Sequence, residues 1–267
     1  MKPLLVGVIH LPPLPGSPRA SLPARSIAQS AATDAAALVD ARFDAVIVEN
    51  FGDAPFFATR VPAITVAAMT VCVAEVLRAT EGRLAVGVNV LRNDGESAIA
   101  VAAATGASFV RINVLSGARV TDQGVVEGRA AETMRLRRAL GAEGVEVWAD
   151  VDVKHSAPLG ASSSIDQEVH DVVERGLASA VLVTGEGTGK AVDEQKLARV
   201  ARAAGGARVL VASGATIDAL PHLARSAGGV IVGTALRVGD RPGGPIDRAR
   251  AAEFAHAFRA AYGVSDA

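Results

Sequence analysis

Short apolar runs alternate along the chain with longer amphipathic or alanine-rich stretches, which is the pattern of buried strands followed by helices. The expected strands are 4–10, 45–49, 84–90, 108–114, 145–153, 180–184, 208–212 and 229–232. The expected helices are 26–40, 63–80, 96–105, 129–140, 165–175, 193–203, 217–225 and 247–262. The remaining segments, including 115–127 and 156–164, are expected to be loops.

This alternation predicts parallel strands joined by right-handed crossovers. Eight strand–helix units without a linker or a composition break predict one (β/α)8 barrel domain over residues 1–267. The alternative is a doubly wound open sheet. Its usual glycine fingerprint after the first strand is missing, because His10 is followed by LPPLPG.

Composition and charge narrow the classes of partner. The formal net charge of −1 gives no basic field for nucleic acid. The chain has no uninterrupted apolar run near the length of about 20 residues that spans a bilayer, so no membrane insertion is expected. The N-terminus has no signal-peptide pattern, which favours a cytoplasmic protein. The single cysteine, Cys72, excludes an intramolecular disulfide and is expected to be a buried apolar residue. A homo-oligomer is compatible with the sequence.

The fifth expected strand carries an unusual set of charges. Strand side chains alternate between two faces, and here one face is entirely apolar. The other face contains Glu146, Trp148, Asp150, Asp152 and Lys154. Charged groups on a buried strand are costly unless they pair with one another or bind a ligand.

Polar residues also end the neighbouring strands, where barrel enzymes place their active sites. By alternation, the residues expected on the lumen face are Glu49, Asn89, Arg111, Asn113, Asp150, Asp152 and Lys154. His10, at the end of the first strand, is a candidate general acid or base. The alternative is a structural ion-pair network in the lumen, for instance Arg111 with Asp150.

Lys154 is expected nearest the bound substrate, with an aspartate as general base or metal ligand. The adjacent carboxylates favour its ammonium form, so we expect an electrostatic role rather than a Schiff base. No cofactor is required by the pattern. A Mg²⁺ ion held by Glu49, Asp150 or Asp152 is chemically reasonable, because hard cations prefer carboxylates.

The last two strands each run into a small glycine turn. Ser213 and Gly214 follow the seventh strand, and Gly233 and Thr234 follow the eighth. Backbone N–H groups at such turns bind phosphate, so these four residues are candidates for the phosphate of a ligand. The alternative is that the glycines only close tight turns. The segment 185–190, GEGTGK, lacks the spacing of a P-loop and is interpreted as a flexible loop, with a lid as one option.

Seven segments carry a resemblance to a known family. They are GVIHLPPLPGSPR, IVENFGDAPF, GVNVLRND, RINVLSGARVTDQGVVEG, ADVDVKHSAPL, SGAT and IVGTALR. With these motifs, spread from Val6 to about Phe254, the chain resembles the BtpA/SgcQ family. The resemblance implies a barrel of the ribulose-phosphate-binding type with a phosphate site. Members of this family are associated with photosystem I biogenesis and with sugar metabolism, and some are described as nucleoside triphosphatases. The resemblance supplies no catalytic residues.

Two functions remain open at this point. The first is an enzyme, such as an isomerase, a lyase or aldolase, or a hydrolase, that acts on a small phosphorylated sugar or nucleotide-like metabolite. The second is a non-catalytic assembly or stability factor of the photosystem type. A charged lumen favours the enzyme, and the low aromatic content of 3% argues against a large protein-binding surface.

Overall fold

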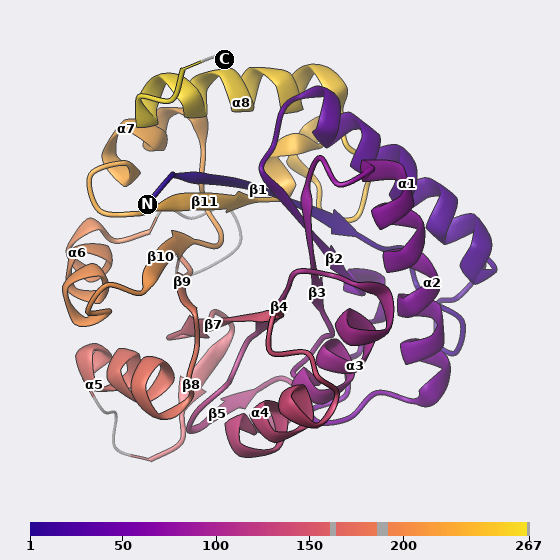
Figure 1. Cartoon of the computed structure of the whole chain (residues 1–267), viewed down its shortest axis with the longest axis horizontal. Helices are drawn as coiled ribbons and strands as arrows, with labels where there is room; N and C mark the ends of the chain where they lie inside the picture. Colours follow the sequence, from indigo (N-terminus) through magenta and orange to yellow (C-terminus); the bar gives the residue numbers. More distant parts are fainter. Residues whose placement is uncertain (161–163, 186–191, 266–267) are drawn as a thin grey trace.

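A closed barrel of parallel strands forms the centre of the molecule (Figure 1). The computed structural model describes residues 1–160, 164–185 and 192–265. The barrel order is β1-β11-β10-β9-β7-β4-β3-β2, and β1 pairs with both β11 and β2 to close the ring. The barrel strands are β1 Leu4–His10, β2 Ala45–Glu49, β3 Ala85–Asn89, β4 Phe109–Ile112, β7 Glu146–Val151, β9 Ala180–Val183, β10 Arg208–Val211 and β11 Gly229–Val232. The predicted (β/α)8 fold is confirmed, and the open-sheet alternative is wrong.

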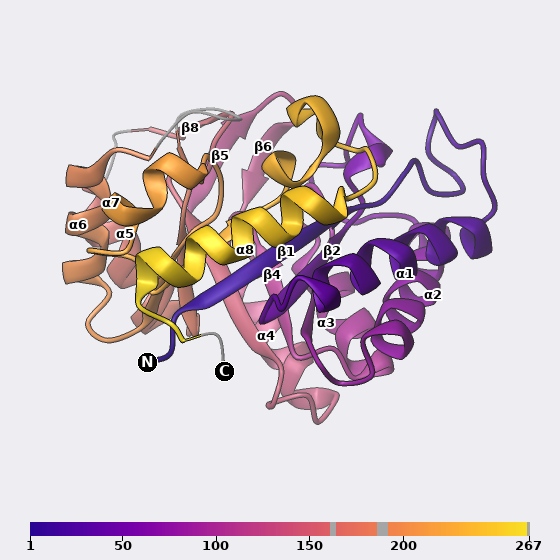
Figure 2. The same ribbon diagram turned by 90° about the horizontal axis from the view of Figure 1, so that it is seen from above.

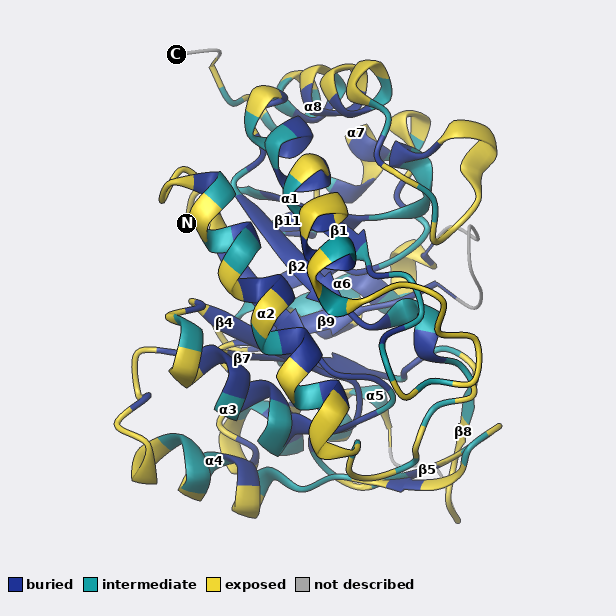
Figure 3. Ribbon diagram, turned by 90° about the vertical axis from the view of Figure 1, so that its right-hand side faces the viewer, coloured by how far each residue is buried: buried dark blue, intermediate teal, exposed yellow. Residues whose placement is uncertain are grey.

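Helices cover the outside of the barrel, with buried faces toward the strands and exposed faces toward solvent (Figure 3). They are α1 Ala24–Asp40, α2 Ala63–Thr80, α3 Gly95–Thr105, α4 Ala130–Ala139, α5 Ile165–His170, α6 Glu194–Ala203, α7 Leu220–Leu223 and α8 Arg248–Tyr262. The seventh helix is shorter than the prediction of 217–225, because its first turn, Ile217–Ala219, is a 3₁₀ helix.

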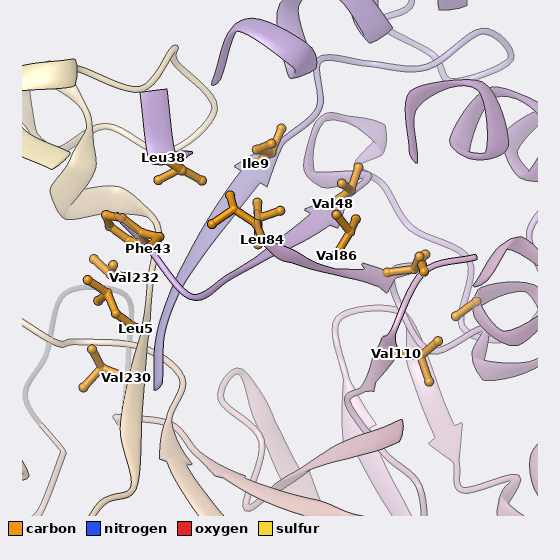
Figure 4. Packing of buried hydrophobic residues seen from close by; sticks show 14 of the residues in the cluster. Leu5, Ile9, Leu38, Phe43, Val48, Leu84, Val86, Val110, Val230 and Val232 are labelled. Atoms are coloured by element: carbon orange, nitrogen blue, oxygen red, sulfur yellow. The ribbon is translucent and has the colours of Figure 1, made fainter. Parts of the chain in front are cut away.

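The outward faces of the strands pack against the helices in a continuous apolar layer. Leu5, Ile9, Val48 and Val86 belong to this layer together with Leu38 of α1 (Figure 4). Helix α1 approaches β1 closely at Gly7, where a Cβ atom would lie 2.5 Å from the Leu38 side chain. A larger residue at that position would therefore push the helix away from the barrel.

A second apolar cluster fills the lower lumen. It contains Ile47, Phe109, Trp148 and Leu182, and the rings of Phe109 and Trp148 stack with their centroids 3.8 Å apart. Gly87 leaves room for this stack, because a Cβ there would lie 2.1 Å from the Phe109 ring. The barrel is thus packed at the N-terminal ends of its strands, and polar residues occupy the other end.

A small antiparallel sheet lies beside the barrel, in segments that were expected to be loops. Its strands are β5 Ala118–Thr121, β6 Gly124–Glu127 and β8 Ser156–Pro158, in the order β6-β5-β8. Figure 2 shows these strands grouped at the end of the molecule away from both termini. Val120 and Val125 pair one position away from the two-residue turn between β5 and β6, which is a hairpin pattern that the prediction of a loop overlooked.

The alternation predicted for residues 145–153 ends earlier than expected. Strand β7 stops at Val151, and Asp152 has a φ of +46°. A residue in this left-handed conformation turns the chain, so the side chains that follow it no longer alternate between the two faces of the sheet. This turn decides where Asp152 and Lys154 lie.

Helix α2 is the one described helix that is long and apolar enough to cross a membrane by length and composition. In the structure it packs against α1 and turns Met69, Cys72, Val73 and Val76 toward the core. Cys72 is a free, fully buried thiol, as predicted.

Candidate functional site

Four polar side chains lie at one height on consecutive strands. His10 pairs in register with Glu49, Glu49 with Asn89, and Asn89 with Arg111. Arg111 is in register with Trp148, so Asp150 lies on the same face of β7, one step closer to the mouth. The structure therefore brings together His10 and four of the seven residues that alternation placed on the lumen face, and we call these five residues the polar layer.

Arg111 and Asp150 form a buried, two-point ion pair. Arg111 donates from Nε to Asp150 Oδ2 at 3.2 Å and from its terminal nitrogen to Oδ1 at 3.0 Å. Asn113 Nδ2 donates to the same carboxylate. Arg111 is 7% exposed and Asp150 is 3% exposed. The alternative of a structural ion pair thus describes this pair correctly, and the Asp150 oxygens are already engaged.

His10 and Glu49 form the second pair of the polar layer, with His10 Nε2 lying 3.8 Å from Glu49 Oε1. Burial lowers the pKa of His10 well below its usual value, and the positive charges of Arg237, Lys154 and Arg111 act in the same direction. The amide of Gly243 donates to His10 Nδ1 at 3.3 Å, which places the proton of the neutral ring on Nε2. Burial raises the pKa of Glu49, because its charged form loses solvation.

Asn89, between Glu49 and Arg111, is 1% exposed, and neither its amide nitrogen nor its oxygen has a hydrogen-bond partner in the described protein. A buried amide without partners is costly, and such groups in native proteins call for a water, an ion or a ligand. The side chain therefore provides a donor and an acceptor inside the barrel mouth.

Lys154 lies near this layer without a counter-ion of its own. Its side chain is half-buried and forms no hydrogen bond or ion pair with any described residue. Burial lowers the pKa of Lys154, and Arg111 and Arg92 lower it further, against the opposing effect of Glu49 and Asp150. The expectation that the carboxylates would prevent a lowered pKa is therefore wrong. Arg92, which also donates to the Lys154 carbonyl at 3.0 Å, adds positive charge to the mouth.

Asp152 does not face the lumen with Asp150, which corrects the grouping of these residues on one strand face. Arg119 donates to its Oδ1 at 2.8 Å and Lys196 donates to its Oδ2. Burial raises the pKa of Asp152, but the bonds to Lys196 and Arg119 outweigh it, so the pKa is lowered overall. These three residues line a cavity of about 550 Å³ that is also bordered by α5 and α6. Asp152 points away from the lumen because its left-handed backbone conformation turns the chain at this residue.

The three proposed metal ligands do not converge. In residues 1–160, 164–185 and 192–265, no group of three or more His, Cys, Asp or Glu side chains could hold a metal ion. Asp150 is engaged by Arg111 and Asp152 by Arg119 and Lys196, which leaves Glu49. A Mg²⁺ ion here would need oxygens of the ligand to complete its coordination.

The two glycine turns end adjacent strands, β10 and β11. Gly214 has a φ of +77°, and the Ser213 hydroxyl is buried without a partner in the described chain. The backbone N–H groups of residues 213–216 have no acceptor among the described residues. Gly233 lies beside the polar layer, since a Cβ there would be 3.2 Å from His10 Cε1. Thr234 begins a short 3₁₀ turn, Thr234–Leu236. The turn after β10 therefore offers backbone N–H groups that no described residue accepts, and the turn after β11 lies next to His10.

Arg237 was not identified from the sequence. It is 1% exposed, and its guanidinium donates to the carbonyls of Gly233, of Gly244 at 2.7 Å and of Val8 at 2.9 Å. It thereby joins the turn after β11 to β1 and to the segment whose Gly243 amide contacts His10. An arginine in a loop is usually exposed, so its burial could not be predicted. The only signal in the sequence was that Arg237 follows the glycine turn at Gly233 by a few residues.

His155, which follows Lys154 in the loop after β7, is exposed and takes no part in the polar layer. Of the loop 185–190, residues 186–190 lie outside the described residues.

Comparison with known proteins identifies the family of this chain. The model of the BtpA family matches residues 1–260. An uncharacterized protein of Thermococcus kodakarensis is 47% identical, with 87% of this chain and 86% of that protein covered. The photosystem I biogenesis protein BtpA of Synechocystis is 41% identical, with 95% and 87% covered. The solved structure of (S)-3-O-geranylgeranylglyceryl phosphate synthase from Thermoplasma acidophilum, in complex with sn-glycerol-1-phosphate, has a TM-score of 0.58 at 16% identity, with 98% and 93% covered. At that identity it shows a shared fold alone. The chain belongs to the BtpA family.

Proposed function

We propose that this protein is an enzyme that acts on a small phosphorylated metabolite bound at the C-terminal face of the barrel. The observation that carries the proposal is Asn89, a fully buried amide with no partner in the described protein. A purely structural core rarely leaves both polar atoms of a buried amide without a partner. A bound ligand that accepts a hydrogen bond from the Asn89 amide nitrogen and donates one to its oxygen offsets the free-energy cost of burying the unpaired amide.

The charges of the mouth favour an anion. Arg92, Arg111 and Lys154 oppose Glu49 and Asp150, and the raised pKa of Glu49 weakens its negative charge. Arg111 is neutralised by Asp150, whereas Lys154 has no ion pair in the described chain. The backbone N–H groups of residues 213–216, which have no acceptor among the described residues, add partial positive charge at the neighbouring strand end. A phosphate ester matches this arrangement, with its phosphate at the two turns and its reacting carbons over the polar layer.

His10 and Glu49 are suited to proton transfer. Burial lowers the pKa of His10, which favours a neutral imidazole, and raises the pKa of Glu49, which favours a protonated carboxyl group that can donate a proton. The reaction class proposed is therefore proton transfer on, or bond cleavage in, a phosphorylated small molecule. Isomerase, lyase and hydrolase chemistry all use these groups.

The test is a thermal-shift screen of the wild-type protein against phosphorylated sugars and nucleotides, with and without Mg²⁺. A ligand at about 100 times its Kd stabilises by roughly 2.7 kcal/mol. For a domain of this size that is on the order of 5–10 °C in Tm. A shift that needs Mg²⁺ supports a metal ion shared by Glu49 and the ligand. If no phosphate ester shifts Tm, the enzyme proposal fails, and a biogenesis role like that in the name of the Synechocystis relative gains weight.

A further inference from the structure

Lysine is rare in this chain, and the described lysines differ in what holds their side chains. The sequence has four lysines, one of which lies outside the described residues. Lys2 and Lys196 each form an ion pair with an aspartate. Lys154 has no ion pair or side-chain hydrogen bond with any described residue, although it is half-buried. Its amine is thus the one described lysine amine without a fixed counter-charge.

The two aspartates that precede Lys154 on the same stretch, Asp150 and Asp152, form ion pairs with other residues. Asp150 is bound by Arg111 and Asn113 inside the barrel. Asp152 is turned outward to Arg119 and Lys196. Burial together with Arg111 lowers the pKa of Lys154, so its ammonium group loses a proton more readily than that of an exposed lysine. A lysine amine that no described residue holds in an ion pair, and that loses its proton more readily, is suited to act as a nucleophile.

We infer that Lys154 is the nucleophile of this site and that the substrate is a phosphorylated aldehyde or ketone, which Lys154 binds covalently as an imine. The inference rests on the proposed function, because the two glycine turns are what would bring the carbonyl of a phosphate ester to the amine. It narrows the open substrate class to carbonyl compounds.

The chemistry balances with groups present in the polar layer. The Lys154 nitrogen adds to the carbonyl carbon while the C=O π electrons move to oxygen, and transfer of a proton from nitrogen to oxygen gives a carbinolamine. Protonated Glu49 then gives its proton to the hydroxyl, which leaves as water with the C–O electrons. The nitrogen lone pair forms the C=N bond, so the products are an iminium ion, water and the Glu49 carboxylate. The raised pKa of Glu49 favours the protonated form that this step requires.

An iminium ion withdraws electrons from the neighbouring carbon. It therefore acidifies an adjacent C–H bond and weakens the next C–C bond, and the Glu49 carboxylate formed in the preceding step can accept the released proton. Among the reaction classes left open above, this favours an isomerase or a lyase. Hydrolysis of a phosphate ester gains nothing from such an intermediate.

The test is reductive trapping with sodium borohydride in the presence of dihydroxyacetone phosphate, glyceraldehyde 3-phosphate or ribulose 5-phosphate, followed by peptide mapping. We expect one adduct per chain, at Lys154, with at least one of these compounds. Lys154→Arg keeps the positive charge but cannot form an imine, so it should give no adduct. Lys196→Arg is the matched control and should be labelled like wild type. No adduct at Lys154 with any of the three, or equal labelling of Lys2, Lys154 and Lys196, overturns the inference.

Two further measurements separate this inference from the proposed function. If sn-glycerol-1-phosphate, which has no carbonyl, raises Tm while trapping fails, phosphate binding stands and the imine is refuted. Acetylation of the free protein across a pH series needs no substrate. The Lys154 rate should reach its half-maximum at a lower pH than the rates of Lys2 and Lys196, and coincident curves would contradict the assignment of Lys154 as the nucleophile.

Discussion

Arg111 contacts both carboxylate oxygens of Asp150 inside the barrel, at N···O distances of 3.2 and 3.0 Å. The two side chains come from β4 and β7, which are neighbours in the barrel. Because Asp150 balances the charge of Arg111, neither residue offers its full charge to a ligand, and Lys154 becomes the cation that a ligand can meet. The pair therefore sets the electrostatics of the whole mouth.

Removal of one partner of this pair should destabilise the fold strongly. Asp150→Ala leaves the buried Arg111 guanidinium without a counter-charge, for which we expect a loss of about 3–5 kcal/mol in the free energy of unfolding. The matched control is Asp152→Ala, since the Asp152 side chain is 47% exposed and should cost only about 1 kcal/mol. Urea unfolding of both variants measures the difference, and equal losses would contradict the separate placement of the two aspartates.

Glu49 should make stability depend on pH. Its pKa is raised by burial, so the folded state keeps its proton over a pH range in which the unfolded state has lost it. Stability from this group is therefore complete at low pH and is lost as pH rises above the unfolded pKa. Glu49→Gln should match wild type near pH 4 and become relatively more stable toward pH 8.

Urea midpoints of wild type and Glu49→Gln at a series of pH values provide the measurement. Glu253→Gln, on the exposed face of α8, controls for the chemical change itself. A difference between wild type and Glu49→Gln that stays constant with pH, or that grows toward acid, would show that burial does not dominate at Glu49.

Arg237 should stabilise the fold and orient the glycine turn after β11. Arg237→Met leaves the carbonyls of Val8, Gly233 and Gly244 without their donor, for which we expect a loss of roughly 3 kcal/mol or more. Arg237→Lys keeps the charge but not the three-way geometry, so it should be intermediate. Arg248→Met, at an exposed ion pair, is the control. Denaturation midpoints that are the same for Arg237→Met and Arg248→Met would refute this role.

Gly233 should be required for the ligand rather than for its backbone conformation. Its φ of −127° is not in the left-handed region that favours glycine, but an added Cβ would lie 3.2 Å from His10 Cε1. Gly233→Val should therefore lose the thermal shift caused by phosphate esters. Gly228→Ala, just before β11, meets its nearest atom at 3.5 Å and should retain it. A full shift in Gly233→Val would place the phosphate elsewhere.

The parts of the site that the sequence predicted depend on strict alternation within strands. Glu49, Asn89, Arg111 and Asp150 lie inside regular strands, so their faces follow from counting residues. Asp152 lies one residue beyond β7, and its left-handed conformation ended the alternation that placed it in the lumen. Alternation cannot report where a strand ends, and for that reason it failed one residue after it had been correct.

The remaining features depend on contacts between distant segments. Arg119 and Lys196 lie 33 and 44 residues from Asp152, so no local pattern could reveal that they hold its carboxylate. Arg237 meets Val8 across 229 residues for the same reason. Burial and the charge of Arg111 lower the pKa of Lys154. The contacts of Asp152 with Arg119 and Lys196 also take away a carboxylate that was expected beside Lys154. The β5–β6 hairpin, in contrast, has a local signal in its valines and two-residue turn.

We expect a phosphate ester to bind at the C-terminal face of the barrel, between the turns after β10 and β11. The most direct measurement is a crystal structure of the wild-type protein with saturating sn-glycerol-1-phosphate. We predict the phosphate at about 3 Å from backbone nitrogens of residues 213–216 and 233–235, with the glycerol carbons toward Asn89 and Lys154. Density for the ligand only in the outer cavity beside Arg119 and Lys196, or a phosphate bound away from both turns, would contradict the account.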